Sequence, residues 1–374
     1  MTALVRGAGI VRAMVDRHFE RAALPRMLTY TVTFTCNARC VMCDSWRKDN
    51  AGDLTLDEVQ RIFATLPRMD IVRLTGGEPF VRRDLTEIAE AAATSLRPAL
   101  IHVSTNGFLT ERIVEFCERR PHEVPLHVMI SLDGLADRHD EIRGRAASFS
   151  RAMRTLEALA PRRSELRLTL SVNQTVLDGA GAREYRALRD RLRPLGLRNH
   201  VVVAYKESAT YSLLGAVDVA PRSAGSFEPF GDLTRGDLER LFAEIEEDLR
   251  SYPLAERAAK RYYLDGIRSR LLGSEPSPNP KCVALQAHMR LFPNGDVPVC
   301  QFNGTRVGNL RSQAFADVWF GQAAQDKRAW VRACPGCWAE CEVLPSAIYT
   351  GDLLRSQLLP ARAKRAPASG GGKR

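Results

Sequence analysis

Three cysteines stand close together in the segment TFTCNARCVMCDSW, residues 33–46, directly after an apolar run. Cys36, Cys40 and Cys43 follow the spacing C-x3-C-x2-C. An iron–sulfur cube normally takes four cysteine ligands, so three on one loop can hold three irons and leave the fourth iron open. The alternatives are a structural zinc site or a set of buried thiols. Zinc would need a fourth protein ligand, and no other His or Cys lies near in sequence. The spacing therefore favours an iron–sulfur cluster with one open iron.

The elements that must position this loop follow from the hydrophobic pattern. Apolar runs alternate with amphipathic segments from residue 27 onward, and Thr55 and Glu58 have the spacing of a capping box. Strands that alternate with helices indicate parallel β/α units, which right-handed crossovers would curl into an incomplete six-stranded barrel. The expected strands are 27–36, 70–79, 100–107, 125–134, 165–176 and 199–207. The expected helices are 55–68, 84–97, 110–120, 148–160 and 182–196.

Unusual residues gather where these strands end. Cys36 ends the first strand, and the run Gly-Gly-Glu-Pro at 76–79 ends the second. Because active sites in such sheets lie at the carboxyl ends of the strands, this gathering at one edge predicts a site. The polar residues at the ends of the third, fourth and fifth strands are Ser104, Asn106, Ser131, Asp133 and Asn173.

With these two motifs the sequence resembles the radical S-adenosylmethionine (SAM) superfamily over about residues 27–207. The resemblance implies a [4Fe–4S] cluster held by Cys36, Cys40 and Cys43, whose open iron is chelated by SAM. It also implies reductive cleavage of SAM to a 5′-deoxyadenosyl radical, which abstracts hydrogen from a substrate. A flavodoxin- or ferredoxin-type protein would donate the electron.

The resemblance also suggests which side chains contact SAM. In the family, the strand edge near Glu78 binds the SAM amino group, and glycines allow close approach of the backbone to a ligand. The family usually has an aromatic residue before the third cysteine; here it is Met42, whose thioether can also pack against adenine. The alternative for each polar residue is an ordinary turn or cap. The residues expected to bind SAM are Met42, Gly76, Gly77, Glu78, Pro79, Ser104, Asn106, Ser131, Arg143, Val172 and Asn173.

A second group of cysteines lies near the C-terminus, around a segment at 289–300 whose Asn294-Gly295 pair predicts a β-hairpin. The group comprises Cys282, Cys300, Cys334, Cys337 and Cys341. It resembles the SPASM/twitch extension of radical SAM enzymes, which implies one auxiliary [4Fe–4S] cluster; a zinc ribbon is the alternative.

The ligands of that cluster have two possible assignments. By similarity to the twitch arrangement of an aminocyclitol dehydrogenase, they are the first four of the group, which leaves Cys341 spare. Cys341 could instead replace Cys337. A spare Cys341 could donate a hydrogen atom, as in radical epimerases, or could simply be buried. Cys117, on the apolar face of a helix, is expected in the core.

Composition limits the classes of function. The chain has 374 residues and a net charge of +10, most of it in residues 1–26 and 361–374. The body is therefore close to neutral, and a nucleic-acid partner is not indicated. The nine cysteines are an odd number, and no signal peptide or membrane-spanning run is visible. We expect a cytoplasmic protein whose thiols serve metal or redox chemistry.

The expected organisation has five parts. The first is an amphipathic helix that docks on the barrel or lies on an anionic membrane surface, docking being preferred. A long loop at 208–230 follows the sixth strand, and Pro253 should break the linker helix. The parts are an N-terminal helix (1–26), a radical SAM core barrel (27–230), a helical linker (231–280), a SPASM/twitch-like β-hairpin plus helix domain (281–345) and a basic, disordered tail (346–374).

The leading functional hypothesis is a radical SAM oxidoreductase acting on a small carbohydrate, cyclitol-type or natural-product intermediate. Alternatives are a peptide-modifying maturase, a redox-neutral epimerase and a non-enzymatic iron–sulfur or zinc scaffold. Only about twenty-six residues precede the first strand, too few for a peptide-recognition domain, which favours small molecules over peptides.

Overall fold

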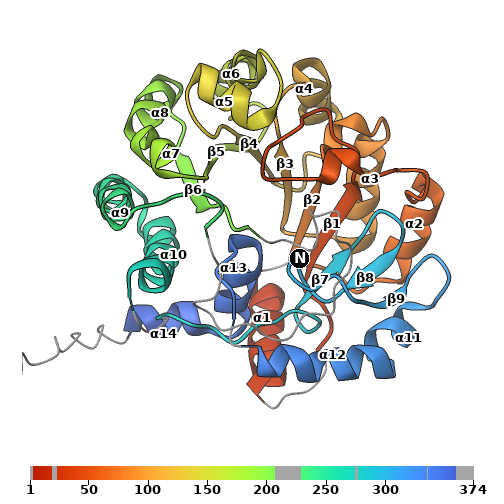
Figure 1. The fold of residues 1–374 in the computed structure, drawn as a ribbon. Helices are drawn as coiled ribbons and strands as arrows, with labels where there is room; N and C mark the ends of the chain where they lie inside the picture. The colour runs from red at the N-terminus through yellow and green to blue at the C-terminus, as the bar shows by residue number, and fades with distance from the viewer. Residues whose placement is uncertain (1–2, 19–22, 207–228, 274–276, 335, 359–374) are drawn as a thin grey trace, which may run out of the picture.

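The architecture is a parallel sheet curved into an open barrel, with helices along its outer side (Figure 1). The computed structural model describes residues 3–18, 23–206, 229–273, 277–334 and 336–358. The strand order is β6-β5-β4-β3-β2-β1-β7, all pairs parallel. This confirms the predicted partial barrel and adds a seventh strand. The strands are β1 (Met27–Thr33), β2 (Ile71–Gly76), β3 (Leu100–Thr105), β4 (Leu126–Ser131), β5 (Leu168–Val176), β6 (Asn199–Val203) and β7 (His288–Leu291).

The crossover helices form for the local reasons that the sequence shows. The Thr55 side chain accepts the backbone N–H of Glu58, and the Glu58 side chain accepts that of Thr55, so the predicted capping box is present. One short helix, α5, was not expected, because its residues are mostly polar and show little apolar periodicity. The helices are α2 (Leu56–Thr65), α3 (Leu85–Ala91), α4 (Thr110–Arg119), α5 (Ala136–Arg143), α6 (Ser148–Leu159), α7 (Gly179–Arg183) and α8 (Tyr185–Leu192).

The two faces of the sheet differ in chemistry. Residues on the outer face, such as Leu28, Val72 and Val103, are buried under the helices in the largest apolar cluster, where Cys117 also lies as expected. Residues that alternate with them face inward, and several are polar. Since a parallel sheet covered by dry core on both faces would be apolar throughout, this alternation marks the inner face as the side for ligands. The inward polar residues include Thr29, Arg73, His102, His127, Ser171, His200 and His288.

The C-terminal third covers the open side of the barrel. Pro253 separates α9 (Arg235–Leu249) from α10 (Leu254–Leu272), as predicted. The Trp338 ring stacks on Tyr262 and Tyr263, and a Cβ built on Gly266 would lie 1.8 Å from that ring. Helix α10 therefore packs tightly against Trp338, the residue that follows Cys337. The remaining helices are α11 (Phe315–Phe320), α12 (Gln322–Ala333), α13 (Glu340–Tyr349) and α14 (Asp352–Leu358).

The hairpin predicted within 289–300 is paired differently from expectation. The turn is present, with Gly295 at φ +90° and the Phe292 N–H donating to the Asp296 carbonyl. However, β7 joins β1, and β8 (Asp296–Pro298) pairs instead with β9 (Arg306–Asn309) in a small antiparallel hairpin. The physical reason is that β1 offers an unpaired edge, and joining it buries apolar residues of β7 in the main core.

The C-terminal end of the chain is more ordered than expected where the structure describes it, and the N-terminal helix is docked as expected. The tail predicted from residue 346 is helical as far as Leu358, because Ala347 and Tyr349 are buried. Residues 359–374 and nearly all of the predicted loop at 208–230 lie outside the described residues. Helix α1 (Ala3–His18) docks through Ala13, which packs in a cluster with Tyr349. No helix among the described residues combines the length and apolarity needed to cross a bilayer.

Candidate active site

The first cysteine loop leaves β1 at the carboxyl edge of the sheet. Cys36, Cys40 and Cys43 are partly buried, and none is in a disulfide. The N–H groups of Ala38 and Ser45 each donate to a thiol sulfur, those of Cys36 and Cys43, at 3.4 Å. Burial raises the pKa of Cys36 to about 12 and of Cys43 to about 11, so iron binding would release their protons.

The end of β2 packs directly against the backbone of this loop. The N–H of Gly77 donates to the Thr33 carbonyl, and a Cβ on Gly76 would lie 2.3 Å from the same oxygen. A Cβ on Gly77 would lie 2.3 Å from the Phe34 carbonyl oxygen. The prediction from sequence was close approach to a ligand. The structure shows that the glycines allow close approach to the cysteine loop itself.

Replacing Gly77 by alanine should push the cysteine loop away from β2. Displacements near 1 Å at a reacting centre can reduce rates about a hundred-fold, so we expect a loss of that order in SAM cleavage. The measurement is 5′-deoxyadenosine formation by protein reconstituted with iron and sulfide. Gly236→Ala is the matched control, because its new Cβ would find its nearest neighbour at 3.9 Å. An unchanged rate in Gly77→Ala would show that the loop tolerates the shift.

Glu78 ties the ends of β2 and β3 together. Its Oε1 accepts the Phe80 N–H at 3.1 Å and the Thr105 hydroxyl at 2.7 Å, and its Oε2 accepts the Asn106 N–H at 2.7 Å. Burial raises the pKa of Glu78 to about 7, although these hydrogen bonds act to lower it. Both carboxylate oxygens thus face the protein, and the side chain positions the rim around the cysteines. The Asn106 amide then donates to Asn37 at 2.7 Å, inside the cysteine loop.

Helix α5 holds the other side of the cysteine loop. The Arg39 and Val41 N–H groups donate to the last carbonyls of α5, at 2.8 and 3.0 Å. Arg143 forms an ion pair with Asp133 at 2.7 Å and lies 3.6 Å from the Cys40 sulfur. The guanidinium was expected to face the SAM carboxylate; the structure places it between a carboxylate and a thiol. Asp133, at the end of β4, had been given no role, and its position at a strand end was the only signal.

The remaining predicted SAM contacts divide between the two faces of the sheet. Ser104 faces inward and bonds His102 Nε2 at 3.0 Å. Ser131 and Asn173 are register neighbours, and Oδ1 of Asn173 is buried with no partner among the described residues, which leaves it available to a ligand. Val172 has the opposite orientation and is fully buried in the outer core, so its side chain is not available to adenine. Met42 packs with Ile142, Leu177 and Ala204 beside the loop.

In the second cysteine group, the surroundings of Cys341 differ from those of Cys300 and Cys337. Burial, together with the charges of Glu342 and Cys282, raises the pKa of both Cys300 and Cys337, so Cys282 is within electrostatic reach of both thiols. Cys334 lies at the C-terminal end of α12. Cys341 instead bonds the Gln301 side chain at 2.5 Å and the Arg290 guanidinium at 3.1 Å. Among the described residues, no three His, Cys, Asp or Glu side chains converge as a single ion would require.

The chain segment that carries the second cysteine group contacts residues that follow the first and the sixth strand. The ring of Phe292, after β7, packs edge-on at 5.5 Å against Phe34 in the first cysteine loop. The ring of Phe302 packs at 6.3 Å against Tyr205, which follows β6. The segment from Phe292 to Phe302 therefore spans from the carboxyl end of the first strand to that of the sixth. The donor sets of both cysteine groups are all thiols, which fits iron–sulfur clusters.

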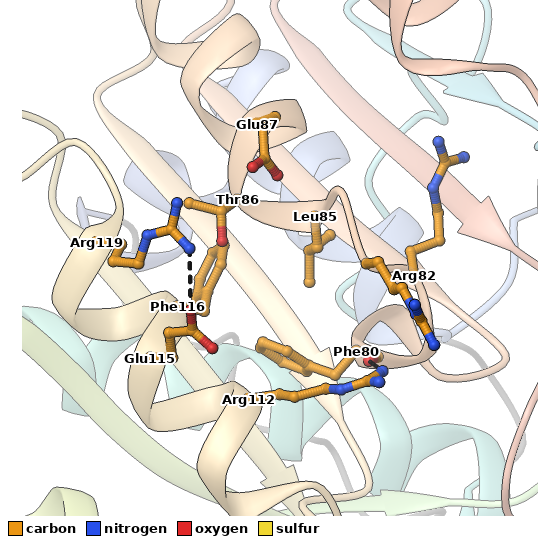
Figure 2. A pocket seen from close by; sticks show the side chains of 10 residues that line it. Phe80, Arg82, Leu85, Thr86, Glu87, Arg112, Glu115, Phe116 and Arg119 are labelled. Atoms are coloured by element: carbon orange, nitrogen blue, oxygen red, sulfur yellow. Dashed lines mark hydrogen bonds and ion pairs between the residues drawn. The ribbon is translucent and has the colours of Figure 1, made fainter.

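A hollow on the outer surface is lined by side chains that hold the turn after Glu78. It measures about 320 Å³ and lies between α3, α4 and the short helix η2 (Pro79–Val81). Figure 2 shows Arg82 and Arg112 around Phe80, and Arg119 bonded to Glu115. The Arg112 guanidinium donates to the Phe80 carbonyl at 3.1 Å, and the Phe80 ring packs on Phe116. These contacts hold the turn from the outer surface. Pro79, at the start of η2, therefore has a structural role in the turn.

Comparisons with known proteins agree with this geometry. Residues 30–192 match the family model of the Radical SAM superfamily, and residues 282–341 match SPASM, an iron–sulfur cluster-binding domain. Mycofactocin maturase MftC of Mycobacterium ulcerans is 38% identical over 154 residues, 40% of this chain and 40% of that protein. The chain thus matches about two fifths of the length of that relative. AdoMet-dependent heme synthase of Methanosarcina barkeri is 26% identical over 79% of this chain and 82% of its own.

Among solved structures, Streptococcus suis SuiB has a TM-score of 0.57 at 17% identity. The match covers 85% of this chain and 71% of SuiB. At this identity the likeness shows the fold.

Proposed function

This chain combines a radical SAM domain with a SPASM iron–sulfur domain, and on that premise we propose that it is a peptide-modifying enzyme. The supporting observation is the cysteine loop at the sheet edge, held by β2, β3 and α5, with a contact to Phe292 in the segment that carries the second cysteine group. When bound, the cluster and SAM would supply a 5′-deoxyadenosyl radical; the protein's part is to position the substrate and exclude competing reactions.

Cys36, Cys40 and Cys43 would hold the SAM-binding cluster. For the auxiliary cluster, the position of Cys282 within electrostatic reach of Cys300 and Cys337 supports the assignment in which Cys334 completes the set. The Cys341 thiol bonds the side chains of Arg290 and Gln301, which supports a role other than ligand.

A peptide substrate replaces the small carbohydrate that the sequence had favoured. One relative is a maturase, and SuiB has been solved bound to its precursor peptide SuiA. The short length of the segment before β1 carries little weight against these names. A net oxidation of the peptide remains our expectation, because an auxiliary cluster can accept an electron from a substrate radical.

The test is product analysis under anaerobic conditions. We would incubate the reconstituted enzyme with SAM, a low-potential reductant or a flavodoxin-type donor, and short peptides encoded beside its gene. The expected result is 5′-deoxyadenosine together with a peptide that has lost hydrogen. A peptide of unchanged mass that gains solvent deuterium in heavy water would point to epimerisation instead. SAM cleavage with no change in any peptide would contradict the proposal.

A further inference from the structure

A cavity lies on the inner face of the sheet, toward the amino ends of the strands and beside Glu340, the residue that precedes Cys341. It has a volume of about 260 Å³ and is bordered by the lower halves of the strands, by α10 and by α13. Figure 1 shows both helices on the open side of the barrel. Much of the wall is apolar, and its apolar residues include Met27, Leu100, Met129, Leu344 and Ile348. This volume is just below the usual range of about 300–1,000 Å³ for ligand pockets and suits one amino-acid-sized group.

Three histidines line this cavity without charging it. Burial lowers the pKa of His102 well below its usual range, that of His127 to about 4 and that of His200 to about 3. They are therefore neutral imidazoles near pH 7. His102 and His127 bond each other at 3.2 Å, and His127 bonds the Ser171 hydroxyl at 2.7 Å. The Nδ1 atom of His200 is buried with no partner among the described residues.

The charged residues of the wall do not balance. Lys260 pairs with Glu340 at 3.6 Å. Burial would raise the pKa of Glu340, but the charges of Lys260 and Arg73 lower it, so the carboxylate is charged. Arg73, in the middle of β2, is the other cation of the wall. Within the described part of the chain it makes no hydrogen bond or ion pair, so the cavity carries one uncompensated positive charge.

Arg73 is half-buried, and a guanidinium held partly out of water without a partner gains from a ligand that supplies the opposite charge. Its planar fork matches a carboxylate, and the apolar wall suits the body that carries that carboxylate. Arg73 lies three residues before Gly76, so at about 3.3 Å per residue its Cα is some 10 Å below the rim. A group held there would place its neighbouring atoms toward the first cysteine loop.

We propose that this cavity anchors a carboxylate of the substrate, through the guanidinium of Arg73 and a ring N–H of His200. The inference rests on the proposed function and adds to it the class of substrate: a peptide or small molecule that presents a carboxylate on an apolar body. The carboxylate is either that of a C-terminal residue or that of an acidic side chain.

The test measures binding of matched probes to the reconstituted enzyme by calorimetry. N-acetyl-leucine carries a main-chain carboxylate, the α-amide of N-acetyl-glutamate carries a side-chain carboxylate, and N-acetyl-leucinamide carries none. We expect at least one acid to bind about tenfold or more tightly than the uncharged amide. Arg73→Gln should remove that preference, and Arg73→Lys, which keeps the charge but not the fork, should keep part of it. Arg119→Gln changes an exposed side chain at the end of α4; it is the matched control and should keep the whole preference.

The two proposals fail in different ways. Equal binding of acids and amide by the wild-type enzyme, or a preference that survives in Arg73→Gln, would overturn the carboxylate anchor. That outcome leaves SAM cleavage by the wild type untouched. Wild-type enzyme that binds the acids but cleaves no SAM would overturn the proposed function alone. Because the first comparison uses only wild-type protein, it does not depend on how well the variants fold.

Discussion

Replacing Cys36, Cys40 and Cys43 together by alanine will abolish reductive cleavage of SAM. The three thiols lie on one loop at the sheet edge, and no other cysteine of the described residues lies near enough in sequence to substitute for them. We expect the rate of 5′-deoxyadenosine formation to fall by about a thousand-fold or more, below what an assay detects. The bound iron should fall by about half, because the auxiliary cluster remains.

The control for this triple variant is Cys117→Ala. Cys117 is fully buried in the outer core on α4, so its loss should cost some stability but leave the iron content and the rate of SAM cleavage unchanged. SAM cleavage that survives in the triple variant would overturn the assignment of the site. Zinc in place of iron in the wild-type protein would have the same consequence.

The second large effect separates Cys337 from Cys341. We expect Cys337→Ala to lose the auxiliary cluster, and with it about half of the bound iron. Product formation should fall far more than SAM cleavage, because the first cluster is held by other residues. Cys341→Ala should keep its iron, since the Cys341 thiol bonds Gln301 and Arg290 rather than the other cysteines.

The measurement is iron and sulfide content together with the ratio of product to 5′-deoxyadenosine. Loss of iron in Cys341→Ala with full iron in Cys337→Ala would show that the alternative ligand set is correct. Normal iron in Cys341→Ala with failed product formation would indicate that its thiol takes part in the reaction as a hydrogen donor.

Local patterns predicted most of the barrel and its rim. The alternation of strands and helices, the capping box at Thr55 and the motifs at strand ends all depend on neighbours in sequence, and the structure has them. Strand parity separates two of the predicted SAM contacts: Val172 and Asn173 are adjacent in β5, so their side chains must face opposite sides.

What the sequence could not predict depends on distant partners. The Asn294-Gly295 turn is a correct local prediction, but the pairing of β7 was decided by the free edge of β1, more than two hundred residues away. Arg73 lies in a strand whose pattern is otherwise apolar, and a charged residue in the middle of such a strand indicates a possible binding site. Its significance appears only when Lys260 and Glu340, from two later helices, pair with each other and leave it out.

The pairing of β7 with β1 has a consequence for how such proteins could exchange parts. Removing the C-terminal module at the linker would take away the strand that pairs with β1. The unpaired backbone groups of β1 would then be exposed, which favours aggregation. A recombination event or an engineered chimera that swaps the C-terminal module must therefore bring a strand that fits the recipient's first one. We expect the two modules to fold together only when β1 and β7 form a compatible pair.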